Sequence, residues 1–563
     1  MLRQLFILSV ILSTGSAFAQ RSKDTTANRD LTFVDKYVPK LMEAQKIESV
    51  PVIVKPELKT VTFSYSIKPH QVSTEKIVNP IPVADLNTKE ETLYPTSFVK
   101  LGYGNIQSKL GEIYLNNKQN KQYSYGMHYR FLESNSELNN SFADFTNHAF
   151  KGYISTYTEI GELGLDINYK NNQFNFYGYD TANKLAEKNL ARTINSFDAR
   201  AYFNSTAISD KKLKHRTQFN FYNYQVGKAI ENQYALGTKL YGNIPNFGDL
   251  KNVQLSANIG VDYNTYKYDT LSPIKRLFIQ FDPRMSFEYD GMQISAGFNT
   301  TIFMNVGDSA VVYPNPFVKV NYPIVPGVAN LYGGIDGRYN KQSLRNIMQT
   351  NPYTTNYELI NTFVNSTTYI GINAKLGAAA DALFEINYSD ITAMPLFITL
   401  NNPLPLPQIT KEKDSLNSFG TRYVQMNLLK FSAAFNYSFS EAVRMGFQGN
   451  FYNYNSKNES EAWQMPNIDG KLNMKFNIKN KVYPHFDILA MGIQKQRSGL
   501  DNLTKQTSTI KAFYDISAGI DYRFKKKLSV FVQANNILNT RYQRWFNYPV
   551  YGFNILGGVT MIF

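Results

Sequence analysis

The sequence predicts an all-β protein: a transmembrane, up-and-down antiparallel β-barrel of about 22 strands with a short extended N-terminal arm. Three observations predict this class: an export signal, strand-like segments with a side-chain period of two, and connections that alternate between short and long. We expect a signal peptide over residues 1–19, an extended periplasmic or lumenal arm over 20–94, and the barrel over 95–563.

The export signal lies at the N-terminus. Arg3 begins a short positive region, residues 5–12 are apolar, and Ala17-Phe18-Ala19 forms a small-residue site, so cleavage is expected after Ala19. The apolar run is too short to cross a bilayer as a helix. The chain contains no cysteine, which excludes lipid attachment at the cleavage site, disulfides, thiolate metal sites and cysteine nucleophiles.

The composition is typical of an outer-membrane barrel. Apolar residues make up 43% of the 563 positions and aromatic residues 14%, with 40 Tyr and 39 Phe. No segment beyond the signal approaches the ~20 continuous apolar residues of a transmembrane helix. Barrel strands place only every second residue against lipid, which hides them from ordinary hydropathy. We therefore predict the outer membrane of a Gram-negative-type bacterium, with outer-membrane lipid and lipopolysaccharide around the barrel.

The net charge of +15 is spread over polar faces and turns, without a long basic block. Such a pattern is typical of a solvated surface near anionic lipopolysaccharide. Nucleic acid is not expected as a partner of an exported chain.

Residues 20–94 differ from the rest of the chain. Several prolines keep much of this stretch extended, at positions Pro51, Pro56, Pro69, Pro80 and Pro82. We interpret the stretch as a tethered arm and not as a compact domain.

Strand-like segments follow one another from residue 95 to the C-terminus. Dividing roughly 470 residues among about 22 strands leaves about 21 residues for each strand and its connection, as tilted spans of about ten residues require. The clearest segments are Ser97–Asn105, Gln122–Leu132, Gly161–Tyr179, Ser196–Ile208, Lys214–Val226, Val253–Tyr268, Ile294–Met304, Ala329–Tyr339, Thr367–Leu376, Leu428–Phe439, Val443–Tyr454, Asp469–Phe476, Phe513–Phe524 and Leu528–Asn536.

Connection lengths alternate along the barrel region. Short connections include Tyr157–Ile160, Tyr289–Gly291, Gly377–Asp381, Phe439–Ala442, Asn480-Lys481 and Lys525–Lys527. Longer and more polar ones lie between them, at Glu133–Thr146, Asp180–Ile194, Lys341–Val364, Met394–Tyr423, Ser456–Gln464 and Gln496–Ser508. Short periplasmic turns and long external loops are typical of membrane barrels, whereas a soluble sandwich has no reason to sort its loops in this way.

The last strand shows the pattern most clearly. Read at period two, the outward face comprises Gly557 and a set of large apolar residues, namely Tyr551, Phe553, Ile555, Val559, Met561 and Phe563. A strand with such a face, ending on an aromatic residue, suits a barrel whose outside meets lipid.

The segment from Phe513 to Phe524 allows its length to be checked. Tyr514, Tyr522 and Phe524 fall on one face, where we expect them near the membrane interfaces. Ten steps of about 3.3 Å at a tilt of about 45° span about 23 Å, close to the thickness of the apolar band. The opposite face carries the candidate lumenal polar residues Asp515, Asp521 and Arg523.

The end of the chain resembles the TonB-dependent receptors. The run Leu528-Ser-Val-Phe-Val-Gln-Ala-Asn-Asn-Ile-Leu-Asn-Thr-Arg-Tyr542 is similar to their penultimate strand and turn, and the strands on either side match in order and spacing. The resemblance is sharp over about the last 55 residues and extends to the barrel through the strand count. It implies a 22-stranded outer-membrane barrel, a C-terminal strand that the barrel-assembly machinery reads, and uptake of a bulky solute.

The chain departs from this family at its N-terminus. Family members carry a plug of well over a hundred residues, whereas residues 20–94 are too few and lack a Gly-rich plug-like pattern. Thr60-Val61-Thr62-Phe63 matches an energy-coupling box only loosely and fits an extended segment more simply. TonB as a partner therefore stays open.

A barrel of this size needs something to close its lumen. The arm, inward loops or a periplasmic or surface lipoprotein partner are the alternatives. One candidate lid is the apolar, proline-rich stretch that contains Pro395, Leu396, Phe397, Pro403, Pro405 and Pro407. A long external loop with ordinary packing is the other interpretation of this stretch.

The sequence contains no recognisable catalytic, cofactor-binding or metal-ligating set. None of the five histidines has the spacing of a metal site, and no serine lies in a nucleophile motif. We therefore predict that the protein is not an enzyme. A channel or transporter-like pore for solutes is the first hypothesis, and a non-transporting structural subunit or docking scaffold of an outer-membrane complex is the second. A third, an energised transporter, requires a plug or coupling box.

Overall fold

The computed structural model describes most of the predicted barrel. The described residues are 97–117, 122–138, 141–177, 191–205, 213–377, 379–400, 418–499 and 506–563. The predicted signal peptide over 1–19 and nearly all of the sequence before the barrel, including the predicted arm over 20–94, lie outside these residues.

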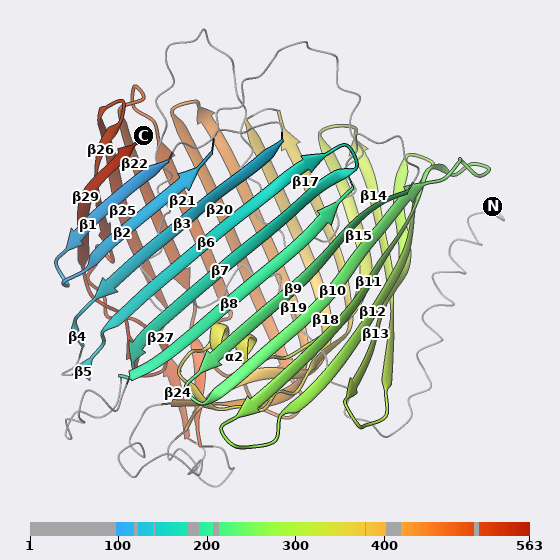
Figure 1. The fold of residues 1–563 in the computed structure, drawn as a ribbon, viewed down its shortest axis with the longest axis horizontal. Helices are drawn as coiled ribbons and strands as arrows, with labels where there is room; N and C mark the ends of the chain where they lie inside the picture. Colours follow the sequence, from blue (N-terminus) through green and yellow to red (C-terminus); the bar gives the residue numbers. More distant parts are fainter. Residues whose placement is uncertain are drawn as a thin grey trace.

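The chain forms a closed antiparallel barrel of 22 strands, which confirms the predicted fold class (Figure 1). The last strand pairs with the first, with Lys100 opposite Thr560, so the sheet has no free edge. The barrel strands are β1 Phe98–Gly104, β2 Lys109–Asn116, β3 Tyr123–Ser134, β6 Phe145–Thr158, β7 Gly161–Asn175, β8 Ala191–Asn204, β9 Leu213–Val226, β10 Ala229–Asn243, β11 Lys251–Tyr268, β12 Ile274–Tyr289, β13 Met292–Asn305, β14 Val311–Val325, β15 Ala329–Asn340, β17 Thr362–Leu376, β18 Ala380–Leu400, β19 Ser418–Ser440, β20 Val443–Ser456, β21 Ile468–Phe476, β22 Val482–Met491, β25 Phe513–Lys525, β26 Leu528–Asn535 and β29 Asn554–Ile562.

The remaining described elements belong to the connections. They are β4 Glu137–Leu138, β5 Ser141–Phe142, α2 Leu344–Thr350, β16 Thr354–Asn356, β23 Gln494–Ser498, β24 Gln506–Ile510, β27 Gln543–Trp545 and β28 Tyr548–Pro549. Within the described ranges no helix is long and apolar enough to cross a membrane.

Side chains alternate across the barrel wall as the period-two pattern predicts. On β29, Ile555, Val559 and Met561 are exposed on the outside, while Thr560 and Ile562 are buried on the inside. Large apolar residues are exposed on the outer face of nearly every strand, the reverse of a soluble protein. Lipid, and not a protein core, therefore covers the outer face.

Connection lengths sort between the two ends of the barrel. At one end the strands join through tight turns such as Asp290-Gly291, and the C-terminal Phe563 bonds there to Ser97 through its backbone N–H (2.9 Å). At the other end lie the long connections 341–361 and 457–467, which in outer-membrane barrels face outwards. Two connections at this long-loop end are nevertheless short, at 105–108 and 227–228.

Candidate functional site: a cap across the barrel mouth

The long-loop end of the barrel is covered by structure that the connections build. β18 and β19 continue past the wall as a hairpin, and short strands add to both of its sides. β16 pairs with β19 in parallel, β23 meets β18 at Thr399 and Ser498, and β24 pairs with β23. We name the whole arrangement the mouth cap and define it as residues 341–361, 394–400, 418–424, 457–467, 494–498 and 543–551.

One face of the hairpin packs into an aromatic cluster. Phe397 and Phe419 meet Trp545, with ring centroids 5.4 and 5.6 Å away. Tyr548 in turn stacks on Tyr353 at 3.6 Å between ring centroids and 23° between planes. These residues form one buried cluster with Leu344, Ile347 and Met348 of α2 and with wall residues that include Tyr222 and Tyr224 of β9, so the cap packs through an apolar core that it shares with the wall.

The opposite face of the hairpin packs on the connection between β20 and β21. Trp463 is fully buried there against Leu396, Ile398 and Val424. Its indole N–H donates to Glu459 at 2.9 Å, and the Arg497 guanidinium donates to both oxygens of the same carboxylate at 2.6 and 2.7 Å. The hairpin is therefore held on both faces, by rings on one side and by a buried ion pair on the other.

A buried polar network ties the α2 connection to the inside of the wall. Glu231 of β10 and Arg276 of β12 are 0% and 3% exposed, and Asn264 of β11 bridges them: its amide N–H donates to Glu231 and its carbonyl oxygen accepts from Arg276. Arg276 also donates to the carbonyl of Gln342 at 2.9 Å, and the backbone N–H of Arg345 donates to Glu231 at 3.1 Å. Because these groups are buried and mutually satisfied, removing one partner is costly.

Three further contacts extend this anchor along the wall. Arg345 pairs with Asp198 of β8, and Lys341 pairs with Asp262 of β11 at 2.6 Å. Arg192 of β8 donates to the carbonyl oxygens of Pro352 and Thr354 at 2.6 and 2.7 Å. The α2 connection thus reaches from the inner wall at β8–β12 to the rings beside β18 and β19, and so crosses the mouth (Figure 1).

The start of α2 is specified locally. Ser343 is its N-cap, with its hydroxyl accepting the backbone N–H of Asn346 at 3.0 Å. The helix has only seven residues, too few for stability on its own, and its buried residues Leu344, Ile347 and Met348 hold it against the cluster.

The tyrosines of the aromatic cluster are strongly desolvated. Burial raises the pKa of Tyr177 to about 12, and burial likewise raises the pKa of Tyr353, Tyr548 and Tyr551 well above the ordinary value. These side chains therefore stay neutral hydrogen-bond donors, as in the bond from the Tyr551 hydroxyl to the carbonyl of Ala143.

Tyr551 does not lie where the period-two pattern puts it. It is 5% exposed and belongs to the aromatic cluster, because β29 begins only at Asn554 and the chain before it turns inward. Phe553 and Phe563, just outside the strand, are exposed together with the outward residues of β29.

The β25 residues lie on the two faces of the wall. Tyr514, Tyr522 and Phe524 are exposed on the outside. On the inside, Asp515 accepts a bond from Tyr542 at 2.6 Å, and Arg523 donates to the carbonyl of Asn480 at 3.3 Å. Asp521 lies 4.0 Å from His485.

The predicted lid stretch is partly strand. Pro395, Leu396 and Phe397 were expected in a loop, but they lie within β18, opposite Tyr423, Arg422 and Thr421 of β19. A bulge with Ala393 at φ 57° precedes them and lets the strand continue with a new register. Pro403, Pro405 and Pro407 lie outside the described residues.

Sequence reasoning missed the α2 anchor and the aromatic core of the cap. One signal was available: the chain has only two tryptophans, Trp463 and Trp545, and both lie in connections. A large apolar ring in a polar loop indicates that the loop packs against something. In the described part of the chain no group of histidine and acidic residues is arranged to hold a metal ion.

Solved structures share this barrel. The pyoverdine receptor FpvA of Pseudomonas aeruginosa superposes with a TM-score of 0.63 at 9% identity, over 83% of this chain and 78% of that one. The FrpB iron transporter of Neisseria meningitidis gives 0.63 at 10% over 83% and 81%, and the ferric-catecholate import receptor Fiu of Escherichia coli gives 0.61 at 10% over 83% and 82%.

The barrel has the fold of the TonB-dependent outer-membrane receptors. The predicted resemblance to these receptors is therefore confirmed at the level of fold. Neither a protein-family model nor a curated protein sequence matches the chain. The similar structures are transport receptors and not enzymes.

Proposed function

We propose that the chain is a gated solute pore of the outer membrane, in which the mouth cap is the gate. The observation that supports this most strongly is the contrast between a polar lumen and a packed, separately anchored cap. A barrel that served only as a scaffold would need neither a lumen suited to water nor a packed cover across its mouth.

The inner wall carries charges that suit a wet lumen. Asp166 pairs with Arg200, Asp336 pairs with Arg338, and Glu112 bonds to His128 at 2.7 Å, all on the side away from lipid. Several of these side chains are partly exposed, which in the lumen means contact with water. Charged side chains in the lumen affect which solutes pass through a barrel.

The cap has the properties of an element with two states. Its hydrogen bonds and ion pairs to the wall at β8–β12 can be replaced by water when the cap moves away, and its apolar contacts there, to Tyr222, Tyr224 and Val226 of β9, would have to separate as well. Its internal contacts are apolar and aromatic, so it can move as a unit and keep its core. Displacement of the α2 connection would open a path past the inner wall.

The proposal retains the prediction that the N-terminal region is an arm. In this proposal residues 20–94 form an arm and not a full plug, and closure comes chiefly from the cap. A periplasmic or surface lipoprotein partner that binds the outer side of the cap would be one way to open it. Coupling to TonB is not needed for a passive, partner-gated pore.

Cross-linking the cap to the wall tests the proposal. The chain has no cysteine, so Asp198→Cys with Arg345→Cys introduces the only two thiols, at residues that pair in the closed state. Purified mature protein in liposomes should admit small solutes faster before treatment with a short cleavable cross-linker than after it, and cleavage should restore the flux. Equal flux in all three states, or no flux in any, would contradict a cap-gated pore and favour the scaffold.

A further inference from the structure

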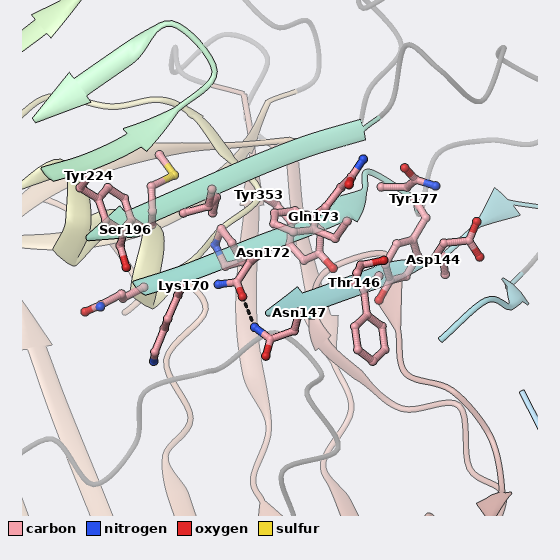
Figure 2. A pocket seen from close by; sticks show the side chains of 18 of the residues that line it. Asp144, Thr146, Asn147, Lys170, Asn172, Gln173, Tyr177, Ser196, Tyr224 and Tyr353 are labelled. Carbon is pink, nitrogen blue, oxygen red and sulfur yellow. Dashed lines mark hydrogen bonds between the residues drawn. The ribbon is translucent and has the colours of Figure 1, made fainter. Parts of the chain in front are cut away.

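A cavity of about 230 Å³ lies between the mouth cap and the inner wall at β6–β9. The wall contributes Asn147 and Asn172, which face each other across paired strands, and the cap contributes Tyr353. Figure 2 shows the two amides joined by a hydrogen bond, with Lys170 and Asp144 on either side of them.

One buried polar atom in this cavity has no partner. Asn147 is 3% exposed and its amide N–H donates to Asn172, but its carbonyl oxygen accepts no hydrogen bond among the described residues. An unsatisfied buried acceptor costs roughly 1–3 kcal/mol. A ligand hydroxyl that donates to this oxygen would remove that cost.

Aromatic rings surround the amides. Phe174 and Tyr177 both meet Tyr353 edge to face, at 5.6 and 5.9 Å between centroids, and Tyr551 closes a further part of the lining. The negative face of such a ring attracts weakly polarised C–H groups. Amides donate and accept at once, which matches hydroxyl groups that do the same.

The charge and size of the cavity restrict the chemical class of ligand further. Its lining carries one cation, Lys170, and one anion, Asp144, so it offers an anionic chelate no excess of positive charge. An apolar ligand would leave the carbonyl oxygen of Asn147 without a donor. The volume lies below the roughly 300–1,000 Å³ of sites for drug-sized ligands, so a solute of single-ring size fits.

We infer that this cavity is a binding site for a neutral, hydroxyl-rich ring such as a pyranose sugar. It lies on the lumenal side of the wall, so the ligand is a free solute and not the saccharide of lipopolysaccharide outside the barrel. The inference deepens the proposed function and rests on it in one respect, since it names the class of solute that enters the pore. Because the mouth cap and the wall both line the cavity, a bound sugar would also contact both of them.

Saturation-transfer NMR on the full mature protein in detergent tests the site without requiring conduction. Glucose, galactose and N-acetylglucosamine are the probes, with galacturonate and citrate as anionic comparisons. Asn147→Leu removes the free acceptor at similar volume, and Ser196→Phe fills the cavity from β8. Asn450→Leu is the matched control, because Asn450 is also a buried lumenal amide with an unpartnered oxygen but lines no part of this cavity.

We expect at least one neutral sugar to receive saturation, with a Kd that rises tenfold or more in Asn147→Leu and in Ser196→Phe and changes less than twofold in Asn450→Leu. Retained heat-modifiable mobility on gels would show that each variant is folded. Equal binding in the two cavity variants and the parent, tighter binding of galacturonate than of galactose, or no transfer to any sugar would overturn the site. Flux without sugar binding would contradict this inference alone, whereas binding without flux would contradict only the pore.

Discussion

The wall and the mouth cap of this barrel are stabilised by different kinds of contact. In the wall each strand bonds to two neighbours, the outer side chains meet lipid and the inner ones meet water or one another. In the cap, connections distant in sequence share an apolar cluster, as where Tyr353 stacks on Tyr548. The wall is therefore a continuous ladder, whereas the cap is a small core resting inside its rim.

This difference indicates how one chain can combine a rigid frame with a movable element. A closed barrel has no free edge, so the wall cannot open without loss of many backbone bonds at once. The cap is joined to the wall through the polar network around Glu231 and Arg276 and through apolar contacts to wall residues such as Tyr224. Changes in the polar network should affect the cap and spare the wall.

The largest expected effect is the release of the cap by Arg276→Met. The substitution leaves Glu231 as an uncompensated buried charge, which costs about 3–5 kcal/mol. Hydrogen exchange measured by mass spectrometry should show loss of protection in residues 341–361, while the barrel strands remain protected. Arg338→Met is the control, since Arg338 pairs with Asp336 on the same inner wall and is partly exposed; its exchange pattern should match the parent.

A substitution on the outer face should instead destabilise the wall. Val532 is exposed to lipid in the middle of β26, and Val532→Arg should destabilise the barrel by about 2–4 kcal/mol. Gln533→Arg, one position along and facing the lumen, should be tolerated. Urea unfolding of the protein in lipid vesicles compares the two; similar losses would contradict the assignment of faces.

Loss of a single aromatic ring should loosen the cap more gently. Tyr548→Leu removes the stack on Tyr353 together with the ring contacts to Tyr177 and Phe419, and an aromatic pair of this kind is worth about 0.5–1.5 kcal/mol beyond the buried area. Exchange in residues 341–361 should accelerate by at least roughly twofold to thirteenfold, as that energy implies. Tyr437→Leu removes a stacked ring from the wall instead, beside Phe435, and should leave the cap unchanged.

The smallest effect is a dependence of the cap on acid. Burial alone would raise the pKa of Glu459, but the bonds from Trp463 and Arg497 outweigh it and hold the pKa below its ordinary value of 4.5. The carboxylate therefore stabilises the cap above pH 4.5, and this stabilisation is lost as the pH falls through the lowered pKa. In a Trp545→Phe background, Trp463 fluorescence should change below pH 4.5, and Glu459→Gln should abolish that transition.

The wall was largely predictable because its pattern is local. Alternation from Phe513 to Phe524 is enough to place Tyr514 outside and Asp515 inside, since lipid and water act on each residue directly. The prediction for Tyr551 was wrong because alternation does not tell where a strand begins. Pro395 to Phe397 continue a strand because a bulge restores the pairing, and no local motif marks that bulge.

The cap was not predictable for a related reason. The partners of Arg276 lie at Glu231 and Gln342, and those of Trp463 lie across the β18–β19 hairpin, so each contact depends on which strands the barrel brings together. Residue types at these positions are ordinary for lumenal polar groups. Only the closed barrel gives them their roles.

The central claim is that the α2 connection closes the mouth, and single-channel conductance in planar bilayers tests it most directly. Asn340 and Thr362 pair across β15 and β17, so residues 341–361 can be replaced by a two-residue turn without disturbing the wall. Shortening the connection 306–310 at the same end, which contributes nothing to the cap, is the control. The account predicts a large, steady conductance for the replacement and a mostly closed state for the parent and the control. Equal conductance in all three proteins would contradict it.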